Sequence, residues 1–330
     1  MSKITPLLSV IVPIYQVEKY LEQCLSTLID NSKSIISGEA EIILINDGSF
    51  DNSEAIAQKF ADKFVFVSLY NKDNGGLSDA RNYGLGKIKS NYISFIDSDD
   101  FVVDSFIDEI VFIIKQQTFD ILSFDFEKKY GDFCSPIENN NADCQVKNVD
   151  KDFYLDCSVF AWQRIYNKKL FKAHKFTKNL YFEDVALIPL LIDESSCLLY
   201  FNKSMYAYRQ RNGSICSHSN NDYLDILRAI KNLTESSRSQ FINYIVAKQV
   251  FTLVFISLRK SLKEQNENLD KIGFFLIDDL EINKIDTVLT KYTIFFYLYK
   301  IFGVKVKFLF MLLSPLAKFH SYLKSRKIKG

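Results

Sequence analysis

The first hundred residues alternate between short apolar runs and segments whose apolar residues recur every three or four positions. Continuous runs rich in β-branched residues predict buried strands, and the helical spacing predicts amphipathic helices. The predicted strands are residues 8–12, which Pro13 ends, 41–45, 65–70 and 92–96. The predicted helices are residues 17–28, 51–63 with Asp51 as N-cap, and 77–87. Such alternation predicts an α/β fold with a mostly parallel sheet and helices on both faces.

The pattern changes twice in the rest of the chain. A predicted helix (105–117) and strand (121–126) are followed by a polar stretch, Gly131–Asp152, that is interpreted as a loop or a mobile insertion. Beyond Asp222 the chain becomes helical and increasingly aromatic. We therefore expect three parts, formed by residues 1–104, 105–221 and 222–330.

Composition and charge narrow the class of protein. The chain has 330 residues, of which 48% are hydrophobic and 25% charged, a balance typical of globular proteins and not of disordered ones. The net charge of +1 hides an asymmetry, because the segment from Thr287 to Gly330 has basic residues and no acidic one. An acidic body with a basic tail argues against a general nucleic-acid binder and favours an enzyme whose C-terminus meets an anionic surface.

The cysteine and histidine content argues against a zinc-binding protein and against a disulfide-rich one. The six cysteines are isolated, with no CxxC pair, and there are only three histidines, so neither a zinc cage nor a disulfide scaffold is predicted. Reduced thiols in a cytosolic chain are the simplest interpretation. The apolar run near the N-terminus is interrupted by Pro13 and lacks a small-residue cleavage site, which favours a first strand over a signal peptide.

Acidic residues follow the last predicted strand of the first hundred residues. In parallel sheets ligands bind beyond the carboxyl ends of the strands, which is where Asp97, Ser98, Asp99 and Asp100 lie. Asp97 and Asp99 project to the same side of an extended chain, and their repulsion favours a cation such as Mg²⁺ or Mn²⁺. A solvated turn or a helix N-cap is the alternative.

Asp47, with Asp51 beyond it, forms a second acidic point at a strand end. A carboxylate here could accept hydrogen bonds from a nucleobase imide or from ribose hydroxyls. The alternative is an Asx turn that begins the next helix.

A glycine-containing turn leads into the third predicted helix. Asn74, Gly75 and Gly76 allow close approach of a ligand to the backbone, and Arg81 follows one turn into the helix. Backbone amides and the helix dipole at such a position can hold phosphate. As a generic motif the segment is weak, because it is neither a P-loop nor GxGxxG.

Two segments of the second part could also carry chemistry. Glu183 and Asp184 lie between apolar stretches and offer a general base, although an acidic pair at a helix N-terminus is the alternative. Arg209, Arg211 and Ser214 lie in a segment that could close on a diphosphate and stabilise a leaving group. An ordinary basic surface turn is the alternative there.

Taken together, these segments resemble the inverting family 2 glycosyltransferases, which have the GT-A fold and use nucleotide-diphosphate sugars. The resemblance is specific over about residues 8–104, fair over 160–214 and absent after about 222. The matching segments are Ser9–Tyr15, Tyr20–Leu21, Ile45–Asp51, Asn74–Gly84 and Phe95–Asp100. It implies that residues 1–104 bind the nucleotide sugar and that residues 105–221 bind the acceptor and supply the base.

The resemblance also implies a role for each matching residue. Asp47 would contact the uracil of a UDP-sugar, Asp99 with Asp97 would bind Mn²⁺ or Mg²⁺, Asp184 beside Glu183 would be the catalytic base, and Trp162 would lie near the sugar or acceptor. The nucleobase pocket would be lined by Pro13, Tyr15 and Glu18. The full nucleotide-sugar-binding set would be Pro13, Tyr15, Glu18, Asp47, Asp51, Asn74, Gly75, Gly76, Arg81, Asp97, Ser98, Trp162, Arg209, Arg211 and Ser214.

The activity implied is transfer of a hexose or N-acetylhexosamine, with inversion, from a UDP-sugar to a saccharide acceptor. A polyprenyl-diphosphate-linked acceptor in bacterial capsule, O-antigen or exopolysaccharide synthesis fits this resemblance. Two alternatives stay open: transfer to a protein or a teichoic-acid-like polymer, and a catalytically silent subunit of a membrane-bound assembly complex.

The segment of residues 292–327 is apolar, aromatic and basic at once. Its longest uncharged run near the end, residues 308–317, is too short to span a bilayer. We expect an amphipathic helix lying on the anionic cytoplasmic face of the membrane, which would make the protein peripheral. The alternative is a helical cap that packs on the enzyme body or on a sister subunit in a homodimer.

Overall fold

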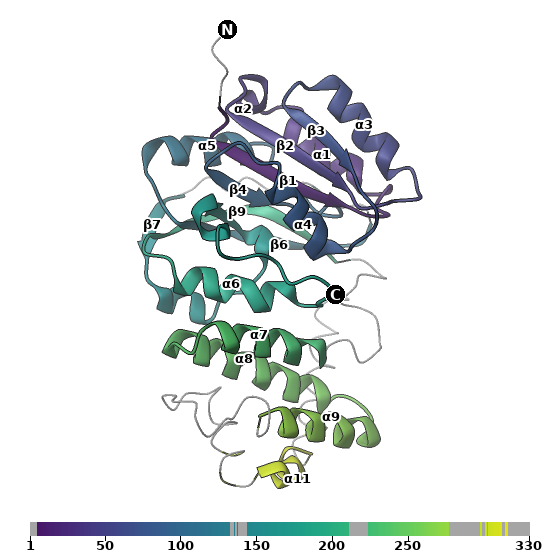
Figure 1. Ribbon diagram of the computed structural model, residues 1–330, viewed down its shortest axis with the longest axis vertical. Coiled ribbons are helices and arrows are strands. Elements are labelled where there is room, and N and C mark those ends of the chain that lie inside the picture. Colours follow the sequence, from purple (N-terminus) through teal and green to yellow (C-terminus); the bar gives the residue numbers. More distant parts are fainter. Residues whose placement is uncertain are drawn as a thin grey trace. The chain divides into compact units, whose positions relative to one another are not determined.

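The computed structural model describes residues 5–132, 135, 137, 144–210, 224–276, 298, 301, 303–311, 314 and 315. Contacts within the chain divide it into two compact units, residues 1–218 and 219–330. The further division of the first unit at residue 104 stays a prediction. Figure 1 shows the elements of both units, and each unit is described here by itself.

A mixed sheet forms the centre of the first unit (Figure 1). Its strand order is β3-β2-β1-β4-β8-β6-β9-β5, with β7 also paired to β9. The strands are β1 (Leu8–Ile14), β2 (Ala40–Asn46), β3 (Val67–Asn71), β4 (Tyr92–Phe95), β5 (Phe101–Val102), β6 (Ile121–Tyr130), β7 (Val146–Val149), β8 (Arg164–Asn167) and β9 (Leu198–Gln210). Strands β3, β2, β1 and β4 are parallel, and β8 then joins β4 in the antiparallel sense.

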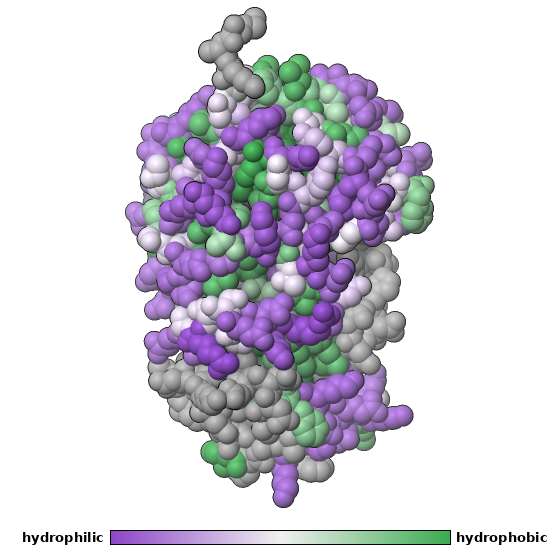
Figure 2. All heavy atoms as spheres, in the orientation of Figure 1, coloured by the Kyte–Doolittle hydropathy of each residue, from purple (hydrophilic) through white to green (hydrophobic). Residues whose placement is uncertain are grey.

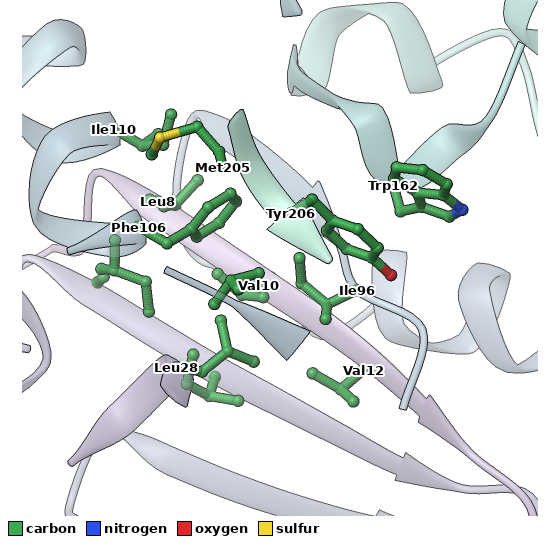
Figure 3. Close-up of a cluster of buried hydrophobic side chains, with 14 of the residues drawn as sticks. Leu8, Val10, Val12, Leu28, Ile96, Phe106, Ile110, Trp162, Met205 and Tyr206 are labelled. Atoms are coloured by element: carbon green, nitrogen blue, oxygen red, sulfur yellow. The ribbon is translucent and has the colours of Figure 1, made fainter. Parts of the chain in front are cut away.

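Helices cover both faces of this sheet. The helices of the first unit are α1 (Leu21–Ile29), α2 (Lys33–Ile36), α3 (Ser53–Lys63), α4 (Leu77–Leu85), α5 (Phe106–Gln116) and α6 (Glu183–Asp193), with short 3₁₀ turns at Lys151–Leu155, Ala161–Gln163 and Lys168–Phe171. Alternate residues of β1, such as Leu8 and Val10, belong to the same buried cluster as Leu28 of α1 and Ile110 of α5 (Figure 3). The predicted α/β class with helices on both faces is therefore confirmed.

Helix α4 packs against the opposite face of β1, where it approaches closely. A Cβ atom placed on Gly84 would lie 2.5 Å from Cγ2 of Ile11, so only glycine lets the helix backbone come this near to the strand. This close packing fixes the position of Arg81, one turn earlier on the same helix.

Pro13 does not end the first strand as the sequence predicted. It lies inside β1 and pairs with Ile45 of β2. On the other side, β4 pairs with β1 only as far as Ile11. Pro13 therefore occupies a part of the strand that has a partner on one side only, where a missing N–H leaves the sheet intact.

The polar stretch predicted as a loop contains a strand. Residues Val146–Val149 form β7, which pairs antiparallel with Leu198–Phe201 of β9. The prediction failed because an exposed edge strand can be polar and still form a ladder through its backbone. Most of residues 133–143 lie outside the described part of the chain.

Trp162 lies in the interior of the first unit, where only 2% of it is exposed. Its ring stacks on Tyr206 at a centroid distance of 4.1 Å and on Phe160 at 4.8 Å, and Phe126 meets it edge-on. Figure 3 shows Trp162 beside Tyr206. Aromatic neighbours cover both faces of the ring, and the expectation that Trp162 lies near the sugar or acceptor stays a prediction.

The second unit is helical over its described residues. It contains α7 (Ile226–Ser236), α8 (Gln240–Ser257), α9 (Leu262–Phe274), a 3₁₀ turn (Gly303–Val306) and α11 (Lys307–Met311). By length and composition α8 could cross a membrane, and 56% of it is buried; the core helix of a soluble protein meets the same criteria.

In Figure 2 the described residues present a mostly hydrophilic face with small hydrophobic patches.

Most of the basic segment predicted to lie on a membrane is outside the described residues. Within its described part, Val306 and Phe310 are buried. Lys307 forms an ion pair with Asp270 of α9 at 2.6 Å. This part of the segment packs on α9 within its own unit. The membrane-surface helix and the helical cap both stay predictions.

Replacing Trp162 tests its structural role. We expect Trp162→Ala to lower the free energy of unfolding by about 3–5 kcal/mol, because it opens a cavity in an aromatic stack. The measurement is urea unfolding followed by circular dichroism. Phe112→Ala, at a 63% exposed position of α5, is the control and should change stability by less than about 0.5 kcal/mol. Equal effects of the two substitutions would contradict the buried placement.

Candidate active site

The candidate site lies at the carboxyl ends of the parallel strands. Tyr15 follows β1, Asp47 follows β2, and Asp97 comes two residues after β4. Because β2, β1 and β4 are adjacent and parallel, these ends meet at one edge of the sheet. The sequence predicted this placement from strand ends alone.

Arg81 joins the two acidic segments that the sequence singled out. Its guanidinium donates to Asp97 Oδ1 at 2.8 Å, to Glu183 Oε1 at 2.7 Å and to Asp184 Oδ1 at 3.1 Å. The Arg81 side chain is only 1% exposed. It was predicted to lie near ribose and phosphates. Here its two terminal nitrogens donate to carboxylates of both acidic segments, and its Nε has no hydrogen-bond partner among the described residues.

Two local features bring Glu183 and Asp184 to Arg81: hydrogen bonds of the Asn82 side chain and the backbone conformation of Phe182. Asn82, the next residue of α4, exchanges two hydrogen bonds with the main chain of Phe176, at 2.7 and 3.0 Å. Phe182, which precedes α6, has a left-handed conformation with φ of 61°. Such a conformation is costly for a bulky residue and re-aims the chain at the start of the helix.

The turn after β4 is held from the inside. Asp100 is buried, and its carboxylate accepts from the Tyr206 hydroxyl at 2.7 Å and from the Arg209 amide at 2.7 Å. The Tyr206 hydroxyl also accepts from the Asp97 amide at 3.2 Å. Ser98 is buried and Asp99 is half-buried. Tyr206, which the sequence did not single out, thus fixes two residues of the acidic turn.

Arg209 is a fixed residue of β9, not part of a mobile loop as predicted. It is 2% exposed, and its side chain donates to the main-chain oxygens of Asp99 and Asp132 and to Gln23 Oε1, at 2.5–2.7 Å. Its guanidinium also lies 5.0 Å from the ring centre of Tyr20. Arg211 and Ser214 lie outside the described residues.

Asp47 faces the glycine turn. Its carboxylate oxygens accept from the amides of Gly75 at 3.0 Å and Gly76 at 2.8 Å, and Lys72 contacts Oδ1 at 2.5 Å. Asn74 donates to the Asp47 carbonyl at 2.9 Å. A carboxylate of the protein thus accepts from the amides of the glycine turn, and the role of this turn in holding phosphate stays a prediction.

Two neighbouring carboxylates also bind within the protein. Asp51 accepts from the amides of Glu18 and Ser53, and Glu18 accepts from the amide of Asn52 at 2.9 Å. The N-cap position of α3 is Asn52, one residue after the predicted Asp51, although Asp51 does accept a first-turn amide. These contacts tie the segments after β1 and β2 to each other.

An exposed aromatic pair lies at the same edge. Tyr15 is 45% exposed and Phe50 is 80% exposed, with ring centres 6.4 Å apart in an edge-to-face arrangement. Pro13, by contrast, is buried. Phe50 was not among the predicted site residues; its signal in the sequence is an aromatic residue within a polar segment at a strand end.

Comparison with known proteins identifies the family. Residues 9–175 match the family described as Glycosyl transferase family 2, which is half of the chain. The chain belongs to glycosyl transferase family 2.

Several curated relatives match the same region. Glycosyltransferase GlyA of Streptococcus pneumoniae is 32% identical over 227 residues, and the match covers 63% of this chain and 31% of GlyA. EpsJ of Bacillus subtilis is 30% identical over 223 residues, covering 64% of this chain and 63% of EpsJ. The chain thus spans less than two thirds of either relative.

Solved structures share the GT-A fold of this family 2 member. The structure of Staphylococcus aureus TarS residues 1–349 with UDP-GlcNAc has a TM-score of 0.71 at 18% identity, covering 97% of this chain and 92% of that one. At this identity the likeness concerns the fold. TarS residues 1–349 have also been solved with UDP.

The site of this family 2 enzyme is strongly acidic. Burial raises the pKa of Asp97 and of Asp100, and repulsion from Asp99 raises both further. Burial raises the pKa of Asp184 to about 6, against the attraction of Arg81 and with the repulsion of Glu183. Arg81 is the described cation in direct contact with Asp97 and Asp184, so negative charge exceeds positive charge here.

The residues present fit a divalent cation. Asp97 and Asp99 offer hard oxygen atoms, which suit Mg²⁺ and Mn²⁺, and their mutual repulsion is what a bound cation relieves. Among the described residues, no group of three or more His, Cys, Asp or Glu side chains is arranged to hold a metal alone. Oxygens of water or of a bound diphosphate would complete the coordination.

The raised pKa of Asp184 predicts an effect on stability. The pKa of about 6 in the folded state lies above the ordinary value of 3.8, so the ionised carboxylate destabilises the folded state at neutral pH. This loss of stability disappears as the pH falls towards 4, where the carboxyl group is protonated in the folded state. We expect the stability of Asp184→Asn relative to the wild type to rise by about 2–3 kcal/mol between pH 4 and pH 8. Urea unfolding at both pH values measures this, and a difference independent of pH would contradict it.

Proposed function

We propose that the chain transfers a hexose or N-acetylhexosamine from a UDP-sugar to a saccharide acceptor, with inversion at the anomeric carbon. The observation that carries the proposal is the position of Asp184. It stands at the start of α6, bound to the same guanidinium that binds Asp97 of the acidic turn. A candidate base and a candidate diphosphate site are thereby joined through one side chain.

Asp184 has the properties of a general base. Its pKa of about 6 leaves it largely ionised at neutral pH yet basic enough to accept a proton in the transition state. Its side chain is 15% exposed, so a hydroxyl group can reach it from solvent. The neighbouring Glu183 accepts a hydrogen bond from Arg81 at 2.7 Å and thereby helps to hold the guanidinium in place.

The reaction is a single displacement. The acceptor oxygen forms a bond to the anomeric carbon of the donor sugar as its proton passes to Asp184. The bond between that carbon and the β-phosphate oxygen breaks, and its electron pair leaves with UDP. Inversion follows because attack and departure take place on opposite faces of the sugar.

The nucleotide end of the site has partners for a UDP group. Tyr15 offers an exposed ring at the end of β1 on which a base can stack. TarS binds UDP-GlcNAc and UDP on a similar fold, which makes UDP-GlcNAc the first donor to test. Asp99 and Asp97 would hold Mn²⁺ or Mg²⁺, which when bound neutralises charge on the leaving diphosphate.

Two observations bear on the proposed acceptor. GgaB of Bacillus subtilis, described as a minor teichoic acid biosynthesis protein, is 31% identical over 214 residues, covering 62% of this chain and 23% of GgaB. A lipid-linked saccharide at the cytoplasmic face of the membrane agrees with the basic C-terminal segment. A teichoic-acid-like polymer is the second candidate, and GgaB is the observation that favours it.

Loss of the base should abolish most activity. We expect Asp184→Asn to lower kcat by roughly 10²–10⁴-fold with little change in the KM for UDP-sugar, because proton transfer is lost and donor binding is kept. In the wild type, kcat/KM should fall on the acid side with an apparent pKa of about 6. Glu194→Gln, at the other end of α6, is the control and should retain activity. Full activity of Asp184→Asn would refute the base assignment.

Removal of the divalent metal ion should also abolish activity. We expect UDP release from UDP-GlcNAc or another UDP-sugar to require Mn²⁺ or Mg²⁺, to stop with EDTA, and to be lost in Asp99→Asn. Asp104→Asn, an exposed position beyond the same turn, is the control. If neither the wild type nor the variant releases UDP from any UDP-sugar, and both still join a membrane-bound assembly complex, the result would favour the catalytically silent subunit.

A further inference from the structure

One peptide group lies between Asp184 and a buried arginine that the mechanism above does not use. It is the group that joins Phe160 to Ala161. Its N–H donates to Asp184 Oδ2 at 2.9 Å, and its carbonyl oxygen accepts from Arg164 Nη1 at 2.7 Å. The second carboxylate oxygen of Asp184 therefore connects to Arg164 through a single rigid plane.

Arg164 is directed at the main chain of this segment. It is the first residue of β8, is 1% exposed, and donates from Nη2 to the Ser158 carbonyl at 2.6 Å. Its Nε has no hydrogen-bond partner among the described residues. The Tyr154 ring centre lies 5.5 Å from the guanidinium. A buried charge that leaves a donor unpaired is costly, so a purely structural contact would be better made by a neutral group.

Other contacts fix the same peptide segment. Tyr166, two residues along β8, donates from its hydroxyl to the Ala161 carbonyl at 2.9 Å. Gln163 donates to the Phe124 carbonyl at 3.0 Å, which anchors the 3₁₀ turn on β6. The amide aimed at Asp184 thus belongs to a rigid support and not to a free loop.

The charge of Arg164 acts on Asp184 in two ways. A cation at the carbonyl end of a peptide group polarises that group, which strengthens the hydrogen bond made by its N–H to an anion. Arg164 also attracts the carboxylate directly through a buried region of low dielectric. Both effects favour the ionised form of Asp184, and both depend on the positive charge.

We infer that Arg164 is a positioning residue for the general base: through the peptide group between Phe160 and Ala161 it orients the Asp184 carboxylate and stabilises its ionised form. The inference rests on the proposed role of Asp184 as base. It adds a second arginine, which is connected to Asp184 through Oδ2, whereas Arg81 binds Oδ1.

Several charged groups face Asp184 and set its proton affinity together. Burial raises the pKa of Asp184, Arg81 of α4 lowers it, Glu183 raises it, and the Ala161 amide and Arg164 lower it. Asp97 of the acidic turn also repels this carboxylate, and Tyr166 of β8 lies close enough to interact with it. Removing Arg164 alone should therefore move the acid limb of the pH profile to higher pH.

The test compares Arg164→Met with Arg164→Lys in the full-length protein. With UDP-GlcNAc, or whichever UDP-sugar the wild type hydrolyses, we expect Arg164→Met to lower kcat roughly 10–100-fold, the size of effect seen for groups that orient a functional ligand. The donor KM should change less than about twofold, and the acid limb of kcat/KM should shift to higher pH. Arg164→Lys should restore part of kcat and most of the pH profile, because it keeps the charge.

Two controls separate this role from loss of stability. Leu122→Ala removes a buried side chain of β6, so it should lower the Tm without moving the acid limb. In an Asp184→Asn background, Arg164→Met should cause no further loss of kcat, since the carboxylate through which it acts is absent. An unmoved acid limb, or an equal fold-loss in both backgrounds, would overturn the inference.

The outcomes also distinguish this inference from the proposed function. If Asp184→Asn is as active as the wild type, the base assignment itself fails. If Asp184→Asn is inactive and Arg164→Met keeps wild-type kcat and pH profile, only the role of Arg164 fails.

Discussion

The buried guanidinium of Arg81 is the interaction on which the arrangement of this site depends. It reaches Asp97, 16 positions along the chain, and Glu183 and Asp184, more than 100 positions along. Burial alone would lower the pKa of Arg81, yet Asp184, Asp97 and Glu183 raise it. Arg81 in turn lowers the pKa of Asp97 and of Asp184 against the effect of burial, so the cation and these carboxylates stabilise one another inside the protein.

The same principle recurs at the acidic turn. Arg209 and Tyr206 of β9 hold the main chain and the Asp100 carboxylate, so one of three neighbouring acids is fixed inward. Asp97 and Asp99 are then left at the edge of the sheet, half-buried. The acidic turn therefore concentrates negative charge at this edge of the sheet. A divalent metal ion bound together with a diphosphate would complement that charge.

Family membership and site geometry answer different questions about this protein. The match over residues 9–175 ends before Glu183, so the family assignment does not itself include the proposed base. The geometry supplies the missing connection, because the α4 side chain of Arg81 lies within the matched region and binds the carboxylates beyond it. The proposed mechanism therefore depends on a contact that crosses this boundary.

Much of the fold and the location of the site followed from sequence patterns, whereas the contacts within the site did not. Strands and helices of the first hundred residues, apart from the four-residue helix α2, were predicted within a few positions, because their periodicity is local. Strand β7 and the position of Pro13 were not predicted, because each depends on which neighbour lies beside it. The acids at strand ends were predicted as a group for the same local reason.

The sequence by itself determined that carboxylates gather at one edge of a parallel sheet. Only the tertiary structure decided that Arg81 and Arg209 are buried clamps, that Trp162 is covered by aromatic rings, and that Asp47 occupies the amides of the glycine turn. The physical reason is that a long side chain takes whichever partner the fold places within its reach. Those partners, such as Asp184 for Arg81, lie about a hundred residues away.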